Sequence, residues 1–151
     1  MRALVQRVSN ANVRIDDTVC GSIGRGLMIL LGVGHEDTDI DADQCIDKII
    51  NLRIFEDDAG KMNRSVADIG GEILAVSQFT LYADTKKGNR PSFTDAAPPQ
   101  QAELLYNLFC CKLREKGFPN LQTGRFAAHM HVSLVNDGPV TIMITSKREH
   151  V

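Results

Sequence analysis

The chain lacks the long apolar runs that place a protein in a membrane or direct it out of the cell. Its longest apolar stretch, residues 27–33, is far too short to cross a bilayer. No run near Met1 is long enough to form the apolar part of a signal peptide. We therefore expect a cytoplasmic protein.

The cysteines form no recognisable framework. The four of them, Cys20, Cys45, Cys110 and Cys111, include no C-x-x-C pair, and two are adjacent. Such spacing suits neither a zinc site nor a set of disulfides. We expect reduced thiols that are mostly structural.

Positive charge is also scarce. The net charge is −2, whereas a protein that wraps nucleic acid needs a large basic surface. Two small basic clusters remain: Lys86, Lys87 and Arg90 in one, and Lys147 with Arg148 in the other. On charge alone a solvated surface is the favoured interpretation of both.

Familiar catalytic and nucleotide-binding motifs are missing. The sequence has no G-x-S-x-G elbow and no H-E-x-x-H pair. Gly32-x-Gly34 follows an apolar run and precedes a helical pattern, but the third position of a dinucleotide fingerprint is Asp37. Because an acidic residue there would repel a pyrophosphate, we exclude nucleotide binding by that route.

What the chain does contain is the alternation of strand and helix patterns. Apolar periodicity predicts a helix from Thr38 to Arg53 and a second from about Pro99 to Lys116, which Gly117 and Pro119 end. Runs of strand-forming residues are separated by turn-forming ones. Strands are expected over residues 4–8, 13–15, 19–23, 27–33, 73–81, 130–135 and 140–145, with turns at 9–12, 16–17, 57–60 and 136–139.

This order of elements predicts a single compact α/β domain over residues 1–151. Its sheet should be mixed but largely antiparallel, barrel-like and arranged in α/β/β layers with two main helices. Two helices are too few to cover both faces of a large sheet. One face must therefore pack on another sheet or on a second subunit.

Three polar segments are candidates for chemistry. At residues 77–81 an apolar strand runs into hydroxyl and amide side chains, and the rigid end of a strand is a good place for a site. Residues 136–139 contain Asp-Gly, so local composition favours a plain hairpin loop. His129 and His131 would share one face of a strand, but no third ligand lies nearby, so an exposed face is favoured over a metal site.

The sequence resembles the D-aminoacyl-tRNA deacylase family. Residues 77–81 (Ser-Gln-Phe-Thr-Leu) and 136–141 (Asn-Asp-Gly-Pro-Val-Thr) match the two signature segments of that family. Supporting matches lie at residues 6–8, 53–55, 60–63, 90–93 and 123–128. The resemblance covers essentially the whole chain, in order.

The resemblance implies a homodimer with active sites at the subunit interface. The substrate would be the ester that joins a D-amino acid to the terminal adenosine of tRNA, and glycine on a non-cognate tRNA would also be accepted. No metal and no cofactor would be needed. The implied catalytic residues lie at one strand end: Ser77, Gln78, Phe79 and Thr80. A cis peptide bond between Gly138 and Pro139 would reach into the partner's pocket and reject L-amino acids.

The family's chemistry is consistent with these residue types. An aminoacyl ester is already activated, so water or the ribose hydroxyl can attack once backbone N–H groups near Phe79 and Thr80 stabilise the oxyanion. A Thr80 nucleophile ranks second because no base is evident. Further candidates for substrate binding or for support of the Gly-Pro motif are Arg7, Phe126, Met130 and Asn136. Core packing is an equal alternative for Phe126.

Two rival interpretations stay open. A close relative that edits an L-amino acid would share the fold and orient the Gly-Pro pair differently. A non-catalytic nucleic-acid-binding module is the alternative from another class, and the low positive charge argues against it. Because a deacylase grips only the acceptor end of tRNA, a small basic patch would be sufficient for it.

Overall fold

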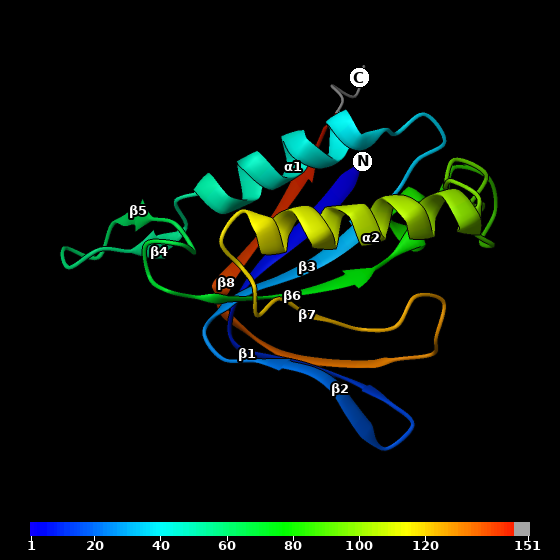
Figure 1. The fold of residues 1–151 in the computed structure, drawn as a ribbon. Coiled ribbons are helices and arrows are strands. Elements are labelled where there is room, and N and C mark those ends of the chain that lie inside the picture. The colour runs from blue at the N-terminus through cyan, green and yellow to red at the C-terminus, as the bar shows by residue number, and fades with distance from the viewer. Residues whose placement is uncertain (147–151) are drawn as a thin grey trace.

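The computed structural model describes residues 1–146, so the predicted basic pair Lys147 and Arg148 lies outside the described residues. Its main sheet has the strand order β2-β1-β3-β6-β7, and β8 pairs with β1 (Figure 1). Pairing with β6 is parallel, and all other pairs in this sheet are antiparallel. The strands are β1 (Arg2–Ile15), β2 (Thr18–Ile23), β3 (Gly26–Gly32), β6 (Glu72–Ser77), β7 (Gln122–Thr123) and β8 (His131–Thr145).

The sheet curls until its two ends nearly meet. One edge of β1 pairs with β8 along most of its length, while the other edge pairs first with β3 and then with β2. At the far end β2 approaches β7 so closely that a Cβ on Gly21 would lie 2.8 Å from the carbonyl oxygen of Thr123. The expected mixed, barrel-like α/β unit with two main helices is confirmed.

Each face of the sheet carries its own core, because side chains alternate between faces along a strand. On β3, Leu27, Ile29 and Leu31 face the core beneath the helices, whereas Met28 faces the inside of the curled sheet. The helices α1 (Asp39–Asn51) and α2 (Pro99–Glu115) lie together over the first face (Figure 1). Thr38 caps α1, with its backbone N–H donating to Asp41 Oδ2 at 2.8 Å.

The predicted turn at residues 9–12 is wrong. β1 runs unbroken from Arg2 to Ile15. Its register against β8 shifts twice, between Gln6 and Val8 and between Val8 and Asn10. These irregularities move the buried side chains from the helix-covered face at Val5 to the inner face at Val8. The chain bends without turning back, and the polar residues lie on the bend.

Two further predictions need correction. The expected hairpin loop at residues 136–139 is a wide bulge inside a single strand, β8, since Gln6 pairs with Thr141 and Val8 with Asn136. The expected strand at 73–81 ends at Ser77 and is followed by a 3₁₀ helix, η1 (Phe79–Tyr82). Residues 57–60 do turn, but they belong to a small hairpin of β4 (Phe55–Glu56) and β5 (Met62–Arg64) that periodicity did not predict.

The helices and the cysteines bear on the class of protein to which the chain belongs. Among the described residues, no helix has the length and apolar character needed to cross a membrane. All four cysteines are free thiols. Burial raises the pKa of both Cys45 and Cys110 to about 11, so these two thiols stay protonated at neutral pH. Their role is therefore structural, as expected.

Candidate functional site

The site begins where β6 ends. The backbone N–H of Gln78 donates to the carbonyl oxygen of Leu31 at 2.7 Å, the last bond between this chain segment and β3. The chain then turns into η1, whose first residue, Phe79, is 53% exposed. A rigid, buried strand thus delivers a short polar segment to the surface.

A cavity of about 630 Å³ opens beside this strand end. Its walls come from residues 76–79, 96–99 and 126–130, with single side chains from elsewhere. Five predicted residues line it: Ser77, Gln78, Phe79, Phe126 and Met130. The walls are mainly apolar with a few polar groups, which is typical of a small-molecule site.

Sequence reasoning missed part of this wall. Phe93, residues 96–99 and Ala102 line the cavity and were not named as site residues, and His129, which was weighed only as a metal ligand, lines it too. Residues 90–93 and 123–128 did belong to the segments that carry the family resemblance, which is the signal that could have identified Phe93 and its neighbours. The spacing of residues along the sequence could not have identified them, since these segments are far apart along the chain.

Aromatic rings shape the cavity. The rings of Phe79 and Phe93 meet edge to face with centroids 5.0 Å apart. Phe126 lies against Tyr106, with centroids 6.2 Å apart. The Tyr106 hydroxyl donates to the carbonyl oxygen of Ala75 at 2.8 Å, and burial raises the pKa of Tyr106 well above its usual range. Phe126 therefore both packs on the core and presents a face to the cavity.

The polar groups at the strand end are chiefly donors. Within residues 1–146, the backbone N–H groups of Phe79 and Thr80 have no hydrogen-bond partner, as is usual in the first turn of a helix. The Gln78 amide donates to Thr80 Oγ1. Thr80 itself does not line the cavity, and no carboxylate or imidazole contacts its hydroxyl in the described part of the chain.

The histidine pair is arranged differently from the sequence-based expectation. His129 precedes β8 and lines the cavity, so the two histidines do not share one strand face. The rings of His129 and His131 meet edge to face with centroids 5.1 Å apart. The described residues contain no group of three side chains that could hold a metal ion.

The remaining predicted residues form a second cluster, on the bulge of β8. The Arg7 guanidinium is buried and donates to the carbonyl oxygens of Asp137 (2.9 Å) and Ile54 (2.7 Å). Asn136 Nδ2 donates to the carbonyl oxygens of Arg7 (2.9 Å) and Val140 (3.0 Å). These bonds hold the bulge at both of its ends.

At the tip of this bulge, Gly138 and Pro139 are exposed, and the peptide bond between them is cis. Gly138 has φ +143°, and a Cβ there would lie 2.7 Å from the backbone nitrogen of Val140. Arg7, Asn136, Gly138 and Pro139 do not line the cavity of the same chain. The structure thus separates the predicted site into a cavity and an outward-facing bulge.

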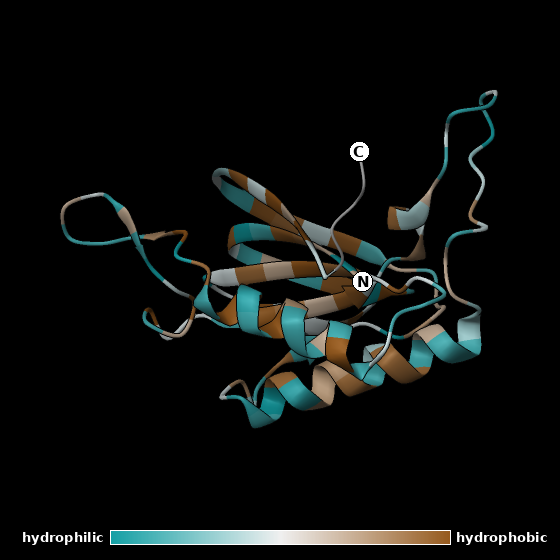
Figure 2. Cartoon of the chain, turned by 90° about the horizontal axis from the view of Figure 1, so that it is seen from above, coloured by the Kyte–Doolittle hydropathy of each residue, from teal (hydrophilic) through white to brown (hydrophobic). Residues whose placement is uncertain are grey.

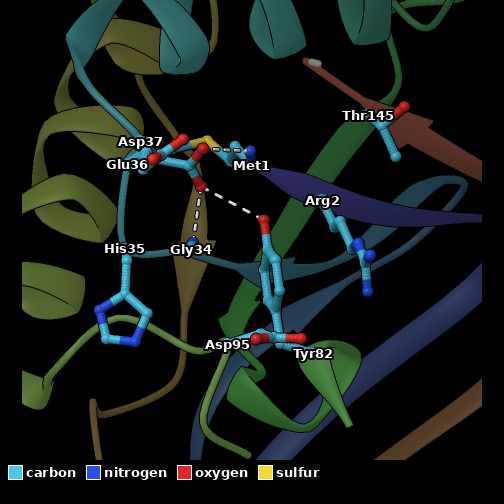
Figure 3. A pocket seen from close by; sticks show the side chains of 9 residues that line it. All are labelled: Met1, Arg2, Gly34, His35, Glu36, Asp37, Tyr82, Asp95 and Thr145. Carbon is cyan, nitrogen blue, oxygen red and sulfur yellow. Dashed lines mark hydrogen bonds and ion pairs between the residues drawn. The ribbon is translucent and has the colours of Figure 1, made fainter. Parts of the chain in front are cut away.

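A polar network supports η1 from behind. The ring of Tyr82 lies against the backbone of Gly32 and Gly34, where an added Cβ would approach the ring to 3.2 and 3.1 Å. Its hydroxyl donates to Asp37 Oδ2 at 3.3 Å, and the Arg2 guanidinium lies over its ring (Figure 3). Arg2 Nη1 also donates to the carbonyl oxygen of Leu81 at 2.8 Å. Burial raises the pKa of Tyr82 above its usual range, and the Asp37 carboxylate adds to this.

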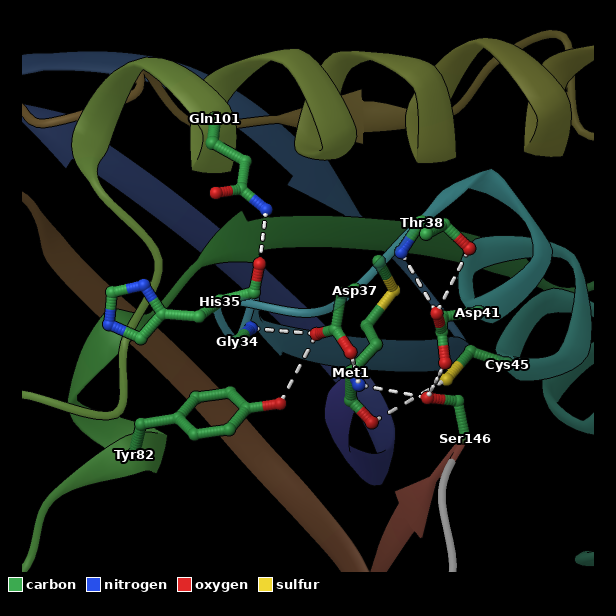
Figure 4. A network of polar contacts seen from close by, with 10 residues as sticks. All are labelled: Met1, Gly34, His35, Asp37, Thr38, Asp41, Cys45, Tyr82, Gln101 and Ser146. Carbon is green, nitrogen blue, oxygen red and sulfur yellow. Dashed lines mark hydrogen bonds and ion pairs between the residues drawn. The ribbon is translucent and has the colours of Figure 1, made fainter.

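Asp37 is the centre of that network. Its other oxygen accepts from the α-amino group of Met1 at 2.6 Å, and Oδ2 also accepts from the N–H of Gly34 at 2.6 Å (Figure 4). The position that excluded a dinucleotide fingerprint is therefore a buried anchor. A smaller cavity of about 320 Å³ adjoins it, and the Met1 amino group, Arg2 and Asp37 in its lining are engaged in these contacts (Figure 3).

Comparison with known proteins identifies the family. The family model described as D-Tyr-tRNA(Tyr) deacylase matches residues 4–145. The chain is 57% identical over 148 residues to the D-aminoacyl-tRNA deacylase of Thermotoga petrophila and 59% identical over 148 residues to that of Anaeromyxobacter dehalogenans, in each case covering 98% of this chain and 99% of the relative. The chain belongs to the D-aminoacyl-tRNA deacylase family, and the expected enzyme class is confirmed.

Solved structures agree on the fold. A structure described as a c-Myc DNA unwinding element binding protein superposes with a TM-score of 0.94 at 46% identity, over 98% of this chain and 100% of that one. A second structure, of a probable eukaryotic D-amino acid tRNA deacylase, gives a TM-score of 0.80 at 18% identity, over 95% of this chain and 97% of that one. The second likeness supports the fold alone.

Proposed function

We propose that the protein hydrolyses the ester bond of D-aminoacyl-tRNA in the cytoplasm and releases a free D-amino acid and tRNA. The observation that carries this proposal is the cavity at the end of β6, which is lined by residues 77–79, within the range that matches the family model. Rejection of L-aminoacyl esters would make the reaction a chiral proofreading step in translation. No metal and no organic cofactor is required.

In the proposed reaction, water adds to the ester carbonyl carbon, either directly or with the assistance of the neighbouring ribose hydroxyl, and gives up a proton. The unpartnered N–H groups of Phe79 and Thr80 would receive the oxyanion, an effect worth roughly 3–4 kcal/mol per good donor. The bond from the carbonyl carbon to the ribose oxygen then breaks, and the ribose oxygen takes up a proton as the tRNA leaves. A Thr80 nucleophile ranks second, because among residues 1–146 the hydroxyl contacts the Gln78 amide and no base.

The residues in the cavity walls indicate where the terminal adenine and the ester of the substrate would bind. The face of Phe126 is suited to stack on the terminal adenine, with Met130 beside it. Ser77 and Gln78 lie at the polar end, where the ester would be placed. This assignment leaves the amino-acid side chain without a tailored pocket, in keeping with an enzyme that accepts many D-amino acids.

Chiral selection is assigned to Gly138 and Pro139 acting on a second copy of the chain. The two residues are exposed and do not line their own chain's cavity, which supports a homodimer whose sites are completed across the interface. Main-chain atoms held by Arg7 and Asn136 would form a wall that an L-substituent strikes and a D-substituent avoids. Glycine has no side chain, so glycyl-tRNA would also be hydrolysed.

The direct test is release of tyrosine from matched D-tyrosyl-tRNA and L-tyrosyl-tRNA by the purified protein. We expect rapid loss of the D-ester while the L-ester stays intact. Loss of the L-ester alone would support the L-editing alternative. Loss of both would show that the wall at residues 138–139 does not select.

A second candidate is nucleic-acid binding without catalysis. It is favoured by one observation, that a relative 46% identical to this chain is described as a DNA unwinding element binding protein. Tight binding of uncharged RNA or DNA with no hydrolysis of either tyrosyl ester would replace the deacylase proposal with this one.

The network behind η1 makes Tyr82 a positioning residue. Tyr82→Ala removes the ring that fills the space against Gly32 and Gly34, so Phe79 and Thr80 lose their support. We expect kcat for D-tyrosyl-tRNA to fall by roughly tenfold to a hundredfold with KM little changed, because misplacement of about 1 Å has effects of that size. Tyr82→Phe keeps the ring and should stay within about fivefold of the parent. An unchanged kcat in Tyr82→Ala, or a change confined to KM, would contradict this role.

A further inference from the structure

A projecting loop connects η1 to α2. Asp84 and Ser92 exchange backbone hydrogen bonds of 2.8 and 2.9 Å across its base, and the N–H of Lys86 donates to Asp84 Oδ1 at 2.9 Å. Gly88, with φ +67°, lies in the left-handed region that lets the tip turn. Figure 2 shows this loop on the right, standing away from the helices and the sheet and mostly hydrophilic.

The loop gathers three cations that have no carboxylate partner in the part of the chain that the structure describes. Lys86, Lys87 and Arg90 are all exposed, and none forms an ion pair within residues 1–146. Basic residues elsewhere are often paired: Lys112 contacts Asp43 at 2.7 Å, and Lys116 contacts Asp47. The one carboxylate between residues 84 and 92 is Asp84, which caps the loop's own backbone. The tip is therefore a local positive patch on a chain of net charge −2.

The base of the loop is a wall of the cavity. Phe93 follows the loop directly, lines the cavity and contacts Phe79. Residues 96–99 continue the wall, and Ala96 bridges to Gly34. His35 Nε2 lies 2.6 Å from the carbonyl oxygen of Thr94, so the segment is tied to the loop that precedes α1. The cations thus project from the rim of the cavity.

We propose that Lys86, Lys87 and Arg90 bind backbone phosphates of the RNA strand that continues from the nucleotide in the cavity. This rests on the proposed function, which places the terminal adenosine in the cavity and leaves the rest of the acceptor stem outside its mouth. Lysine and arginine on an ordered loop neutralise phosphates without reading bases. The patch would therefore contribute affinity for any tRNA and no selectivity among them.

The test compares two double variants that change net charge equally. One is Lys86→Gln with Lys87→Gln. The other is Lys48→Gln with Lys61→Gln, in which Lys61 belongs to the β4–β5 hairpin at the opposite end of the molecule in both views (Figures 1 and 2). KM and kcat are measured for D-tyrosyl-tRNA over a range of salt, and for the 3′ D-tyrosyl ester of adenosine, which has no phosphate.

For the loop variant, KM for D-tyrosyl-tRNA should rise about tenfold at low salt with kcat unchanged. The slope of log KM against log salt concentration should fall by the amount that corresponds to the loss of about two phosphate contacts. Hydrolysis of the adenosine ester should stay as in the parent. The control pair should match the parent with both substrates. Equal effects of the two pairs on tRNA, or no effect of the loop pair, would overturn the proposal.

Binding of uncharged tRNA by the same variants separates this proposal from the proposed function. If the parent hydrolyses neither ester, the deacylase proposal fails. Binding of uncharged tRNA then still tests whether the loop contacts RNA phosphates. A weaker, less salt-dependent affinity in the loop pair alone would support it. Equal affinities in the loop pair, the control pair and the parent would reject it.

Discussion

Replacing Arg7 by methionine should lower both stability and chiral selection. The buried guanidinium donates to the carbonyl oxygens of Asp137 and Ile54. Without it, two acceptors lose their partner, at roughly 1–3 kcal/mol each, so we expect the free energy of unfolding to fall by about 2–6 kcal/mol. The bulge that carries Gly138 also loses its anchor, so the ratio of kcat/KM for D-tyrosyl-tRNA to that for L-tyrosyl-tRNA should fall. Denaturant unfolding and the two esterase assays measure these effects.

Arg14→Met provides the matched control, since Arg14 is exposed on the same strand, β1. It should leave stability within about 0.5 kcal/mol of the parent and the D-to-L ratio unchanged. Arg7→Lys retains the charge but has no planar fork, so it should recover only part of the loss. An Arg7→Met protein that is less stable yet as selective as the parent would limit Arg7 to a structural role.

Gly26→Ala should be the most destabilising single-methyl change in the sheet. Gly26 lies where β3 and β6 pair in parallel, opposite Glu72. A Cβ on Gly26 would lie 1.9 Å from the Glu72 carbonyl oxygen and 2.7 Å from its carbonyl carbon and nitrogen. These are backbone atoms that cannot swing aside, so the two strands must separate. We expect a loss of roughly 3 kcal/mol or more in the free energy of unfolding, at or above the usual range for overpacking.

A nearby glycine provides the control. A Cβ on Gly24 would meet only Oε1 of the flexible Glu72 side chain, at 3.3 Å. Gly24→Ala should therefore cost well under half as much as Gly26→Ala. Thermal or denaturant unfolding of both variants decides the point. Similar stabilities of the two variants would show that the Gly26 contact is relieved by a small strand shift.

Both helices were predictable from the sequence to within two residues, because amphipathic periodicity and end signals are local. The predicted span from Thr38 to Arg53 became Asp39–Asn51 with Thr38 as the cap, and the second helix ended one residue early. Strand interiors were also recognisable. Strand ends and turns were not, as β6 shows by ending at Ser77 where apolar residues continue into η1.

The errors on β1 and β8 have one physical origin. A run of polar, turn-forming residues inside a strand can either reverse the chain or bulge from it, and the choice depends on the partner strand. Here β1 and β8 pair with each other over most of their length, so Asn10 on one and Asn136 on the other stay in the ladder. Hydrogen bonds between residues more than a hundred positions apart decided this.

The sequence by itself determined the family, the two helices, the mixed sheet and the segments that are candidates for chemistry. Only the tertiary structure decided which of those segments lie at the cavity and which lie at the bulge of β8. It gathered Ser77, Gln78 and Phe79 with Phe126 and Met130 around one cavity, and it placed Arg7 and Asn136 beneath an outward-facing bulge that carries Gly138 and Pro139. The reason is that a cavity forms between segments distant in the chain, and the face on which each side chain lies depends on strand pairing and bulges that no local pattern encodes.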